Sequence, residues 1–270
     1  MQREQRGTEP RGDFLLTVLG SRGSIPVTRQ EMREFGGDTS CYLLEARGER
    51  LVLDAGTGLA NASFSQEGPV HILLSHPHVD HLLGLPMFSG LLRKEGEVHL
   101  YGQSAGGLSL EKQLERLISP PLWPSRLQDY PARVICHPLC FPLRIGPFTV
   151  TGMEGCHPGG CAVLRVSACG KDLVYATDFE HTPLKLRQLT EFAAGASLLL
   201  YDAQYTESMY EAKKGFGHST AEMGLRVYSG SGARQLRFIH HDPQQTDAML
   251  REREQRLGMP FARQGEVIVL

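Results

Sequence analysis

One short segment constrains this chain more than any other: residues 76–81, with the sequence HPHVDH. It follows an apolar run of strand character at 71–75 and precedes an apolar segment with helical spacing at 82–87. The segment is therefore predicted to be a loop between a strand and a helix. It brings three imidazoles and one carboxylate into six residues, which is typical of a metal site rather than of isolated structural histidines.

The spacing within this loop indicates two metal ions. Residues two apart in an extended loop point the same way, so His76 and His78 can face one ion. Asp80 and His81 then fall at the start of the next element, where they can face a second ion. The loop thus predicts a dinuclear site.

Length and composition favour one large globular domain. The chain has 270 residues, 41% of them hydrophobic, so residues 13–270 can form a single domain, with residues 1–12 expected to be a disordered tail. The net charge of −2 gives no basic field for tight, sequence-independent nucleic-acid binding. No apolar run reaches the roughly 18 residues of a membrane span, and no signal peptide is evident. We therefore expect a cytoplasmic protein without a membrane partner.

The order of apolar segments predicts an α/β fold. Two strand-rich halves, each flanked by helical patterns, are typical of an α/β sandwich. The expected strands are 14–19, 41–45, 50–54, 71–75, 97–102, 148–151, 161–166, 172–176, 197–201 and 237–239. The expected helices are 107–118, 184–193, 218–228 and 243–257.

The cysteines raise a separate question. There are six, in a chain without a secretion signal, so they are expected to be reduced thiols. Cys136 and Cys140, with Cys156 and Cys161, could together hold a structural zinc ion. Against this, the intervals are longer than those of common zinc knuckles, and Cys161 opens an apolar strand, which suits a small buried side chain.

Metal-type residues recur where the predicted strands end. His157 lies in a glycine-rich turn and is a candidate ligand for the ion of the first two histidines. Asp178 can bridge two ions, because a carboxylate has two oxygens. His240 can complete the ligands of the second ion. It is favoured over His241 because it directly follows a predicted strand. His241 is expected to contact a metal ligand without binding the ion, or to face solvent. Asp54, also at a strand end, is expected to support the loop by hydrogen bonding rather than bind metal.

These motifs in this order resemble the metallo-β-lactamase-fold hydrolases, over nearly the whole chain. The segments LGSRGSIP (19–26), GGDTSC (36–41) and LDAGTG (53–58), with a later GHST (217–220), are similar to the phosphodiesterase branch. That branch includes ribonuclease Z, the phosphoribosyl cyclic phosphate phosphodiesterases and the cyclic-nucleotide phosphodiesterases. The resemblance implies a four-layer αββα sandwich and, often, a homodimer.

The resemblance also implies roles for individual residues. It implies two divalent ions, Zn²⁺ or alternatively Mn²⁺, one held by His76, His78, His157 and Asp178 and the other by Asp80, His81, Asp178 and His240. It implies a catalytic set of Asp80, His218 and Asp202. Asp202 stands where ribonuclease Z usually has a glutamate, which is a departure, and helix capping is its alternative role.

The function expected from this set is hydrolysis of a small, cyclic phosphodiester, such as a cyclic nucleotide or a sugar cyclic phosphate, by a hydroxide between the ions. His218, oriented by Asp202, would donate a hydrogen bond or a proton to the phosphorane or the leaving oxygen. A ribonuclease Z-like RNA endonuclease is the first alternative, although no Lys/Gly-rich insertion that would grip RNA is found. A thiolester, ester or lactam hydrolase, or a non-catalytic metal-binding sensor, are the others.

Overall fold

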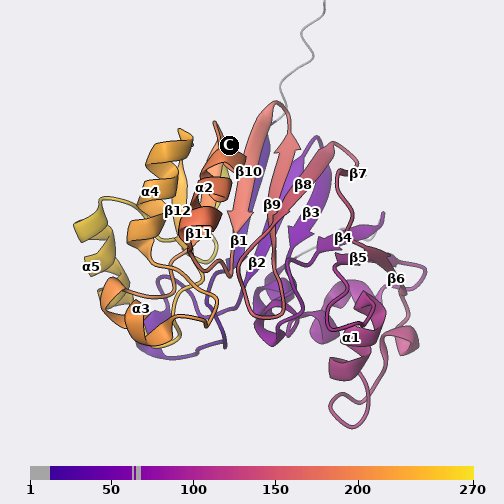
Figure 1. Cartoon of the computed structure of the whole chain (residues 1–270). Coiled ribbons are helices and arrows are strands. Elements are labelled where there is room, and N and C mark those ends of the chain that lie inside the picture. The colour runs from indigo at the N-terminus through magenta and orange to yellow at the C-terminus, as the bar shows by residue number, and fades with distance from the viewer. Residues whose placement is uncertain (1–12, 63, 65–67) are drawn as a thin grey trace, which may run out of the picture.

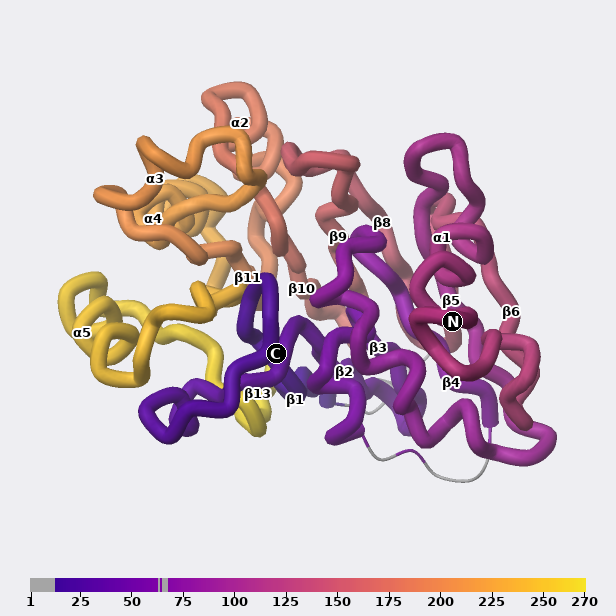
Figure 2. The backbone as a smooth tube through the Cα atoms, turned by 90° about the horizontal axis from the view of Figure 1, so that it is seen from below, coloured from indigo at the N-terminus to yellow at the C-terminus, as the bar shows by residue number. Residues whose placement is uncertain are grey.

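The computed structural model describes residues 13–62, 64 and 68–270. The predicted tail at 1–12 lies outside the described residues. Two mixed sheets face each other, as the two rows of strands in Figure 2 show. In spatial order, the first sheet contains β13 (Val267–Val269), β1 (Phe14–Gly20), β2 (Cys41–Ala46), β3 (Glu49–Leu53), β4 (Val70–Leu73), β5 (Glu97–Gly102) and β6 (Arg133–Pro138). The second contains β12 (Leu236–Ile239), β11 (Leu198–Asp202), β10 (Lys171–Ala176), β9 (Ala162–Ala168), β8 (Phe148–Glu154) and β7 (Leu143–Ile145).

Helices cover the outer face of each sheet, which gives four layers (Figure 1). They are α1 (Leu110–Leu117), α2 (Pro183–Phe192), α3 (Glu207–Lys213), α4 (Ala221–Ser231) and α5 (Asp247–Leu257). Helix α1 packs on the first sheet, whereas α2, α4 and α5 pack on the second. The αββα sandwich predicted from the sequence is confirmed. Among the described residues, every helix is too short or too polar to span a lipid bilayer.

The core between the sheets follows from alternation along the strands. Leu16 on β1, Leu44 on β2 and Leu164 on β9 are fully buried in one cluster between the two sheets. Strand β11, which is parallel to both of its neighbours, has all five residues buried. Strands β3, β4 and β5 are parallel in the first sheet, and β10, β11 and β12 are parallel in the second, so in each sheet the loops that follow these strands lie along one edge.

The helix predicted at 82–87 is wrong. In its place are short 3₁₀ turns, η3 (Val79–His81), η4 (Leu85–Met87) and η5 (Ser89–Leu92). Gly84 approaches the loop after β3 so closely that an added Cβ would lie 2.0 Å from the Gly56 oxygen, and its N–H donates to the Ala55 oxygen at 2.9 Å. The Gly84 N–H, which would bond within a helix, thus bonds to a distant segment instead, and Pro86 has no N–H to donate.

Three predicted helices begin later than expected because a hydroxyl caps each of them. Ser109, Thr220 and Thr246 accept hydrogen bonds from the third N–H of α1, α4 and α5. His218 consequently lies in the loop before α4 rather than in its first turn. The short elements β6, β7, β13 and α3 were not predicted, since their apolar patterns are too brief to stand out from loops.

Candidate metal centre

Side chains of metal-ligand type gather where the strands end, at one edge of the sandwich. Asp54 directly follows β3 and His240 directly follows β12, and Asp178 lies one residue further on after the end of β10. All three have left-handed backbone, with φ of +59°, +48° and +61°. Non-glycine residues rarely adopt this conformation, and where they do it is often at a functional site. It turns these side chains away from the alternating pattern of their strands.

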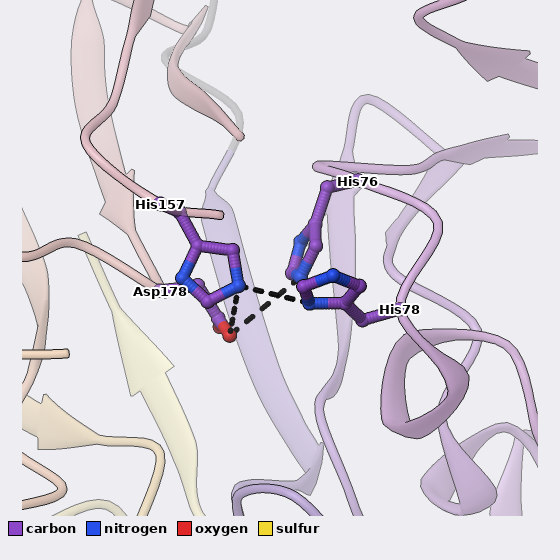
Figure 3. Close-up of side chains that lie close together, drawn as sticks. All are labelled: His76, His78, His157 and Asp178. Carbon is purple, nitrogen blue, oxygen red and sulfur yellow. Dashed lines mark hydrogen bonds and ion pairs between the residues drawn. The ribbon is translucent and has the colours of Figure 1, made fainter. Parts of the chain in front are cut away.

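A first group joins the loop after β4 to the second sheet. Asp178 Oδ2 lies 3.6 Å from both His76 Nε2 and His157 Nε2, and His157 Nε2 lies 2.9 Å from His78 Nδ1 (Figure 3). The four ligand atoms lie within 4.8 Å of one another. The sequence predicted this set, and the structure brings it together.

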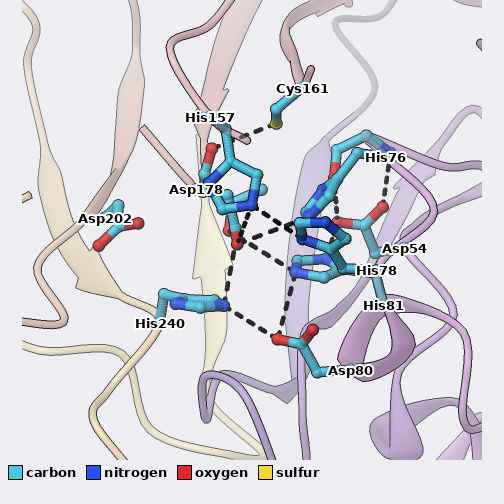
Figure 4. Close-up of polar contacts among 12 residues, drawn as sticks. Asp54, His76, His78, Asp80, His81, His157, Cys161, Asp178, Asp202 and His240 are labelled. Carbon is cyan, nitrogen blue, oxygen red and sulfur yellow. Dashed lines mark hydrogen bonds and ion pairs between the residues drawn. The ribbon is translucent and has the colours of Figure 1, made fainter. Parts of the chain in front are cut away.

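A second group shares Asp178. Its Oδ1 lies 3.2 Å from His81 Nε2 and 3.2 Å from His240 Nε2 (Figure 4). Asp80 Oδ2 lies 3.4 Å from His81 Nε2 and 3.2 Å from His240 Nε2. The two oxygens of Asp178 thus face different groups, which is how a bridging carboxylate is arranged.

The atoms fit divalent cations. His76 Nε2 and His81 Nε2 are buried but make no hydrogen bond, a costly state for a polar atom that metal binding would relieve. Ligand atoms 2.0–2.2 Å from a tetrahedral ion lie about 3.3–3.6 Å apart. The shorter separations, 2.9–3.6 Å in the first group and 3.2–3.4 Å in the second, are close to that value, and all ligand atoms within each group lie within 4.8 Å of one another. Nitrogen-rich groups with one shared carboxylate suit Zn²⁺ and its neighbours.

Charge in the centre is strongly perturbed. Burial opposes ionisation of Asp178, yet His240, His81 and His76 hold the pKa of its carboxyl well below the ordinary value. Burial also opposes a charge on His240, but Asp178 and Asp80 raise its pKa to about 9. For His76 burial dominates and lowers the pKa well below the ordinary value. The negative carboxylates thus attract positive charge into the centre, as a cation site requires.

Second hydrogen bonds orient the histidines. Nδ1 of His81 lies 2.7 Å from Asp54 Oδ2, and Nδ1 of His240 lies 2.8 Å from Gln204 Oε1. Nδ1 of His157 donates to the Gly217 oxygen at 2.8 Å. Such bonds fix the tautomer in which Nε2 is free to bind a metal.

Asp54 is the centre of this supporting network. Its Oδ1 accepts a hydrogen bond from the Ser75 N–H at 2.7 Å. Its Oδ2 accepts from the Ser75 hydroxyl at 2.8 Å, from the Tyr175 hydroxyl at 2.7 Å and from His81 Nδ1 at 2.7 Å. The predicted supporting position of Asp54 matches these contacts. Tyr175 and Gln204 were missed. Tyr175 acts across the two sheets, and Gln204 acts between the loops that follow the neighbouring strands β11 and β12. Their only sequence signal is that they lie close to Asp178 and Asp202 along the chain.

His218 stands beside the two groups and is paired with a carboxylate. Its Nδ1 lies 2.8 Å from Asp202 Oδ2 and 3.8 Å from Asp178 Oδ2, and its ring stacks on His240 with centroids 4.8 Å apart. Asp202 also accepts from backbone N–H groups of Phe179 and Gln204. Those donors are not in a helix, so the capping alternative for Asp202 does not describe its contacts.

A cavity of about 400 Å³ opens onto these residues. Its lining comprises Ser24, His78, Asp80, His157, Pro158, Asp178, Lys214, Gly215, Phe216, His218 and His240. A small molecule can therefore contact both groups and His218 at once.

One expectation is corrected by the structure, and one alternative is not supported. His241 is neither solvent-facing nor beside the centre: it is fully buried, donates from Nε2 to the Ala262 oxygen at 2.8 Å, and packs on Phe35 and Phe261. Consecutive residues point to opposite sides, which sends His241 away from His240. All six cysteines are free, as expected for reduced thiols. The alternative of a structural zinc site is not supported, since no group of described residues that could hold an ion includes a cysteine. Cys161 is buried just before β9, and Cys140 is exposed.

The chain matches known proteins over most of its length. Residues 49–241 match the beta-lactamase superfamily domain. An uncharacterised protein of Mycobacterium tuberculosis is 30% identical over 244 residues, covering 84% of this chain and 81% of that protein. Ribonuclease Z of Haloferax volcanii is 24% identical over 277 residues, covering 83% of each.

Similarity extends to solved structures. The metallo-β-lactamase-fold protein YhfI of Bacillus subtilis superposes with a TM-score of 0.74 at 21% identity, covering 96% of this chain and all of that one. At this identity the superposition shows the shared fold. The domain match over residues 49–241 and the 30% identical relative go further, because they show that the chain belongs to the beta-lactamase superfamily. Taken with its metallo-hydrolase relatives, the chain is a metal-dependent hydrolase of the metallo-β-lactamase fold.

Proposed function

We propose that this protein is a dinuclear-metal phosphodiesterase that hydrolyses a small, cyclic phosphodiester, such as a cyclic nucleotide or a sugar cyclic phosphate. One observation carries the proposal: the His218–Asp202 pair, 2.8 Å apart, borders the same cavity as two ligand groups bridged by Asp178. Beside a cation site, a histidine paired with a carboxylate can donate a proton to the leaving oxygen of a phosphodiester, while the cations neutralise charge on the phosphoryl group.

The proposed ligands are the two groups described above. One ion takes His76, His78, His157 and Asp178, and the other takes Asp80, His81, Asp178 and His240. When bound, two divalent cations lower the pKa of a water molecule and neutralise charge on phosphoryl oxygens. We expect zinc, with manganese as the alternative, because five of the seven proposed ligands are histidines.

His218 is proposed to donate the proton. Its Nδ1 faces Asp202, which leaves Nε2 to donate to the leaving oxygen. Asp202 is a positioning residue, held by backbone N–H groups and by His218 itself. General acid catalysis of this kind contributes about 10²- to 10⁴-fold in rate.

Asp80 is proposed to have two roles. Its Oδ2 faces His81 and His240 and accepts from the Ser24 N–H at 2.8 Å. Among the described residues, these contacts all use Oδ2. We assign Oδ1 to accept a hydrogen bond from the attacking water, which would direct a lone pair of that water toward phosphorus.

Size and charge favour a small substrate over RNA. The cavity of about 400 Å³ suits one small molecule, and the net charge of −2 supplies no broad basic surface. The ribonuclease Z relative supports phosphodiester chemistry in general. Homodimerisation and a cytoplasmic location stay predictions.

The test compares three substrates with one variant. Metal-loaded protein is assayed on cyclic mononucleotides, on a ribose cyclic phosphate and on a precursor tRNA. We expect turnover of a small cyclic substrate, and a 10²- to 10⁴-fold lower kcat in His218→Ala with both metals retained. Cleavage of the tRNA alone would replace the proposal with an RNA endonuclease, and unchanged turnover in His218→Ala would refute the assigned proton donor.

A further inference from the structure

An exposed aromatic ring lies at the mouth of the cavity. Phe216 is 59% exposed, although it lines the same cavity as His218, His240 and Asp178. Single exposed apolar side chains are ordinary on a protein surface, but among the exposed large apolar side chains of the described residues only Phe216 lines this cavity. The rest of the lining is polar or charged except for a proline and a glycine.

The backbone on both sides of this ring is held in place. One carboxylate, Glu180, accepts from the Gly215 N–H at 2.7 Å and from the Gly217 N–H at 3.0 Å. Glu180 is two residues from Asp178, so the segment that carries Phe216 is tied to the bridging residue of the metal centre.

Gly217 ties the same segment to His157. Its oxygen accepts from His157 Nδ1 at 2.8 Å, and an added Cβ would lie 2.0 Å from that nitrogen. With φ of +90°, the position also requires glycine. Phe216 therefore has a fixed attachment between the ligand-type His157 and the proposed proton donor His218. A ring carried on a backbone that is already held in place loses less freedom on binding than one on a mobile loop, which favours its use as a contact for a ligand.

Two lysines lie near the ring. Lys213 Nζ lies 5.1 Å from the ring centroid, and Lys214 lines the cavity. Lys214 is paired with Glu211 at 2.7 Å, but both side chains are largely exposed, so the pair can rearrange at little cost. An aromatic surface with adjacent cations fits a ligand that has a planar base and a phosphate.

From these contacts we propose that Phe216 determines specificity by stacking on a nucleobase, so that the substrate is a cyclic mononucleotide rather than a sugar cyclic phosphate. This inference rests on the proposed phosphodiesterase function. A sugar cyclic phosphate has no π-face to stack, whereas every base does. His218 and the cations would act on the phosphate while Phe216 holds the base two residues away along the chain.

The first experiment measures substrate preference. The ratio of kcat/KM for a cyclic mononucleotide to that for a ribose cyclic phosphate is determined for wild type, Phe216→Leu and Phe216→Tyr. Stacking on an aromatic side chain predicts that Phe216→Leu lowers this ratio about 5- to 150-fold, and that Phe216→Tyr lowers it far less. Leu184→Ala, at an exposed apolar side chain on α2, is the matched control and should keep the ratio. An unchanged ratio in Phe216→Leu, or an equal fall in both leucine and tyrosine variants, would overturn the proposal.

A binding experiment separates this inference from the proposed function. Trp123 is the only tryptophan, so Phe216→Trp in a Trp123→Phe background places one fluorophore at the cavity. Nucleoside monophosphate should quench its emission, and ribose 5-phosphate should not. If quenching occurs but wild type hydrolyses no phosphodiester, stacking stands and the proposed function fails. If wild type hydrolyses phosphodiesters but nucleotide causes no quenching, the proposed function stands and Phe216 is not a base platform.

Discussion

Replacing Asp54 with asparagine should weaken the binding of one metal ion without unfolding the protein. Asp54 is fully buried and accepts four hydrogen bonds, one on Oδ1 and three on Oδ2. The Ser75 N–H can only donate, so in Asp54→Asn the amide oxygen must occupy the Oδ1 position. The amide NH₂ then faces His81, the Ser75 hydroxyl and the Tyr175 hydroxyl.

The new amide changes what His81 can do. Its Nδ1 now meets a donor, so the favourable tautomer carries the proton on Nε2, the atom that faces the second metal group. Loss of such an orienting partner typically weakens metal binding 10- to 100-fold. The two amide hydrogens can serve only two of the three groups, so one polar group loses its partner, at a cost of about 1–3 kcal/mol in unfolding free energy. A domain of ordinary stability tolerates that loss.

The assay is competitive titration of metal-free protein with Zn²⁺ against a chromophoric chelator, with circular dichroism to confirm folding. We expect one of two sites to weaken 10- to 100-fold and the other to change little. Asp172→Asn makes the same chemical change at a partly exposed carboxylate that accepts from Arg165 and Ser167, and should leave both affinities unaltered. Two wild-type affinities in Asp54→Asn would refute the reasoning that Asp54 sets the tautomer of His81.

Three further predictions address other parts of the molecule. Gly217→Ala should lower both the free energy of unfolding and the metal affinity, because the new Cβ would lie 2.0 Å from His157 Nδ1. Gly215→Ala, where φ is +88° and the surrounding space is open, should lower the free energy of unfolding by only about 1–2 kcal/mol. Equal metal affinities in the two variants would contradict this. Asp202→Asn should lower kcat by about 10²-fold or more and shift the pH dependence of kcat, while the metal content stays at the wild-type value. An unchanged pH dependence of kcat would show that His218 does not need Asp202 to orient it. Burial and two neighbouring histidines lower the pKa of His71 to about 4. As the pH falls below about 6.5, this histidine is protonated in the unfolded chain before it is protonated in the folded one, so the free energy of unfolding decreases toward pH 4. Urea unfolding at several pH values should show a weaker pH dependence for His71→Gln than for wild type, and equal dependence in both would refute this role of His71.

Much of the site could be predicted because its residues follow strands. His157, Asp178 and His240 lie after apolar runs whose ends must meet at one edge of an α/β sandwich, so their convergence follows from the fold. The choice of His240 over His241 rested on the position of His240 directly after a predicted strand, and in the structure His240 follows β12 with a left-handed φ and faces the second group.

What escaped prediction depends on contacts between distant segments. The turns after His81 replace a helix because Gly84 packs against Gly56, and no periodicity in 82–87 carries that information. In the sequence, Tyr175 has the pattern of an ordinary inward-facing strand residue. Only the packing of the two sheets brings its hydroxyl to 2.7 Å from Asp54 on the opposite sheet. Phe216 carries no local signal at all, since exposure and closeness to the cavity are properties of the folded chain.

The central claim is that two bound cations make this protein a phosphodiesterase. The most direct test counts metal ions in a purified preparation and, in that same preparation, measures hydrolysis of bis(p-nitrophenyl) phosphate before and after chelation. We predict two ions per chain, turnover that chelation abolishes, and recovery when Zn²⁺ or Mn²⁺ is restored. Two ions per chain with no cleavage of this or any cyclic phosphodiester would contradict the account.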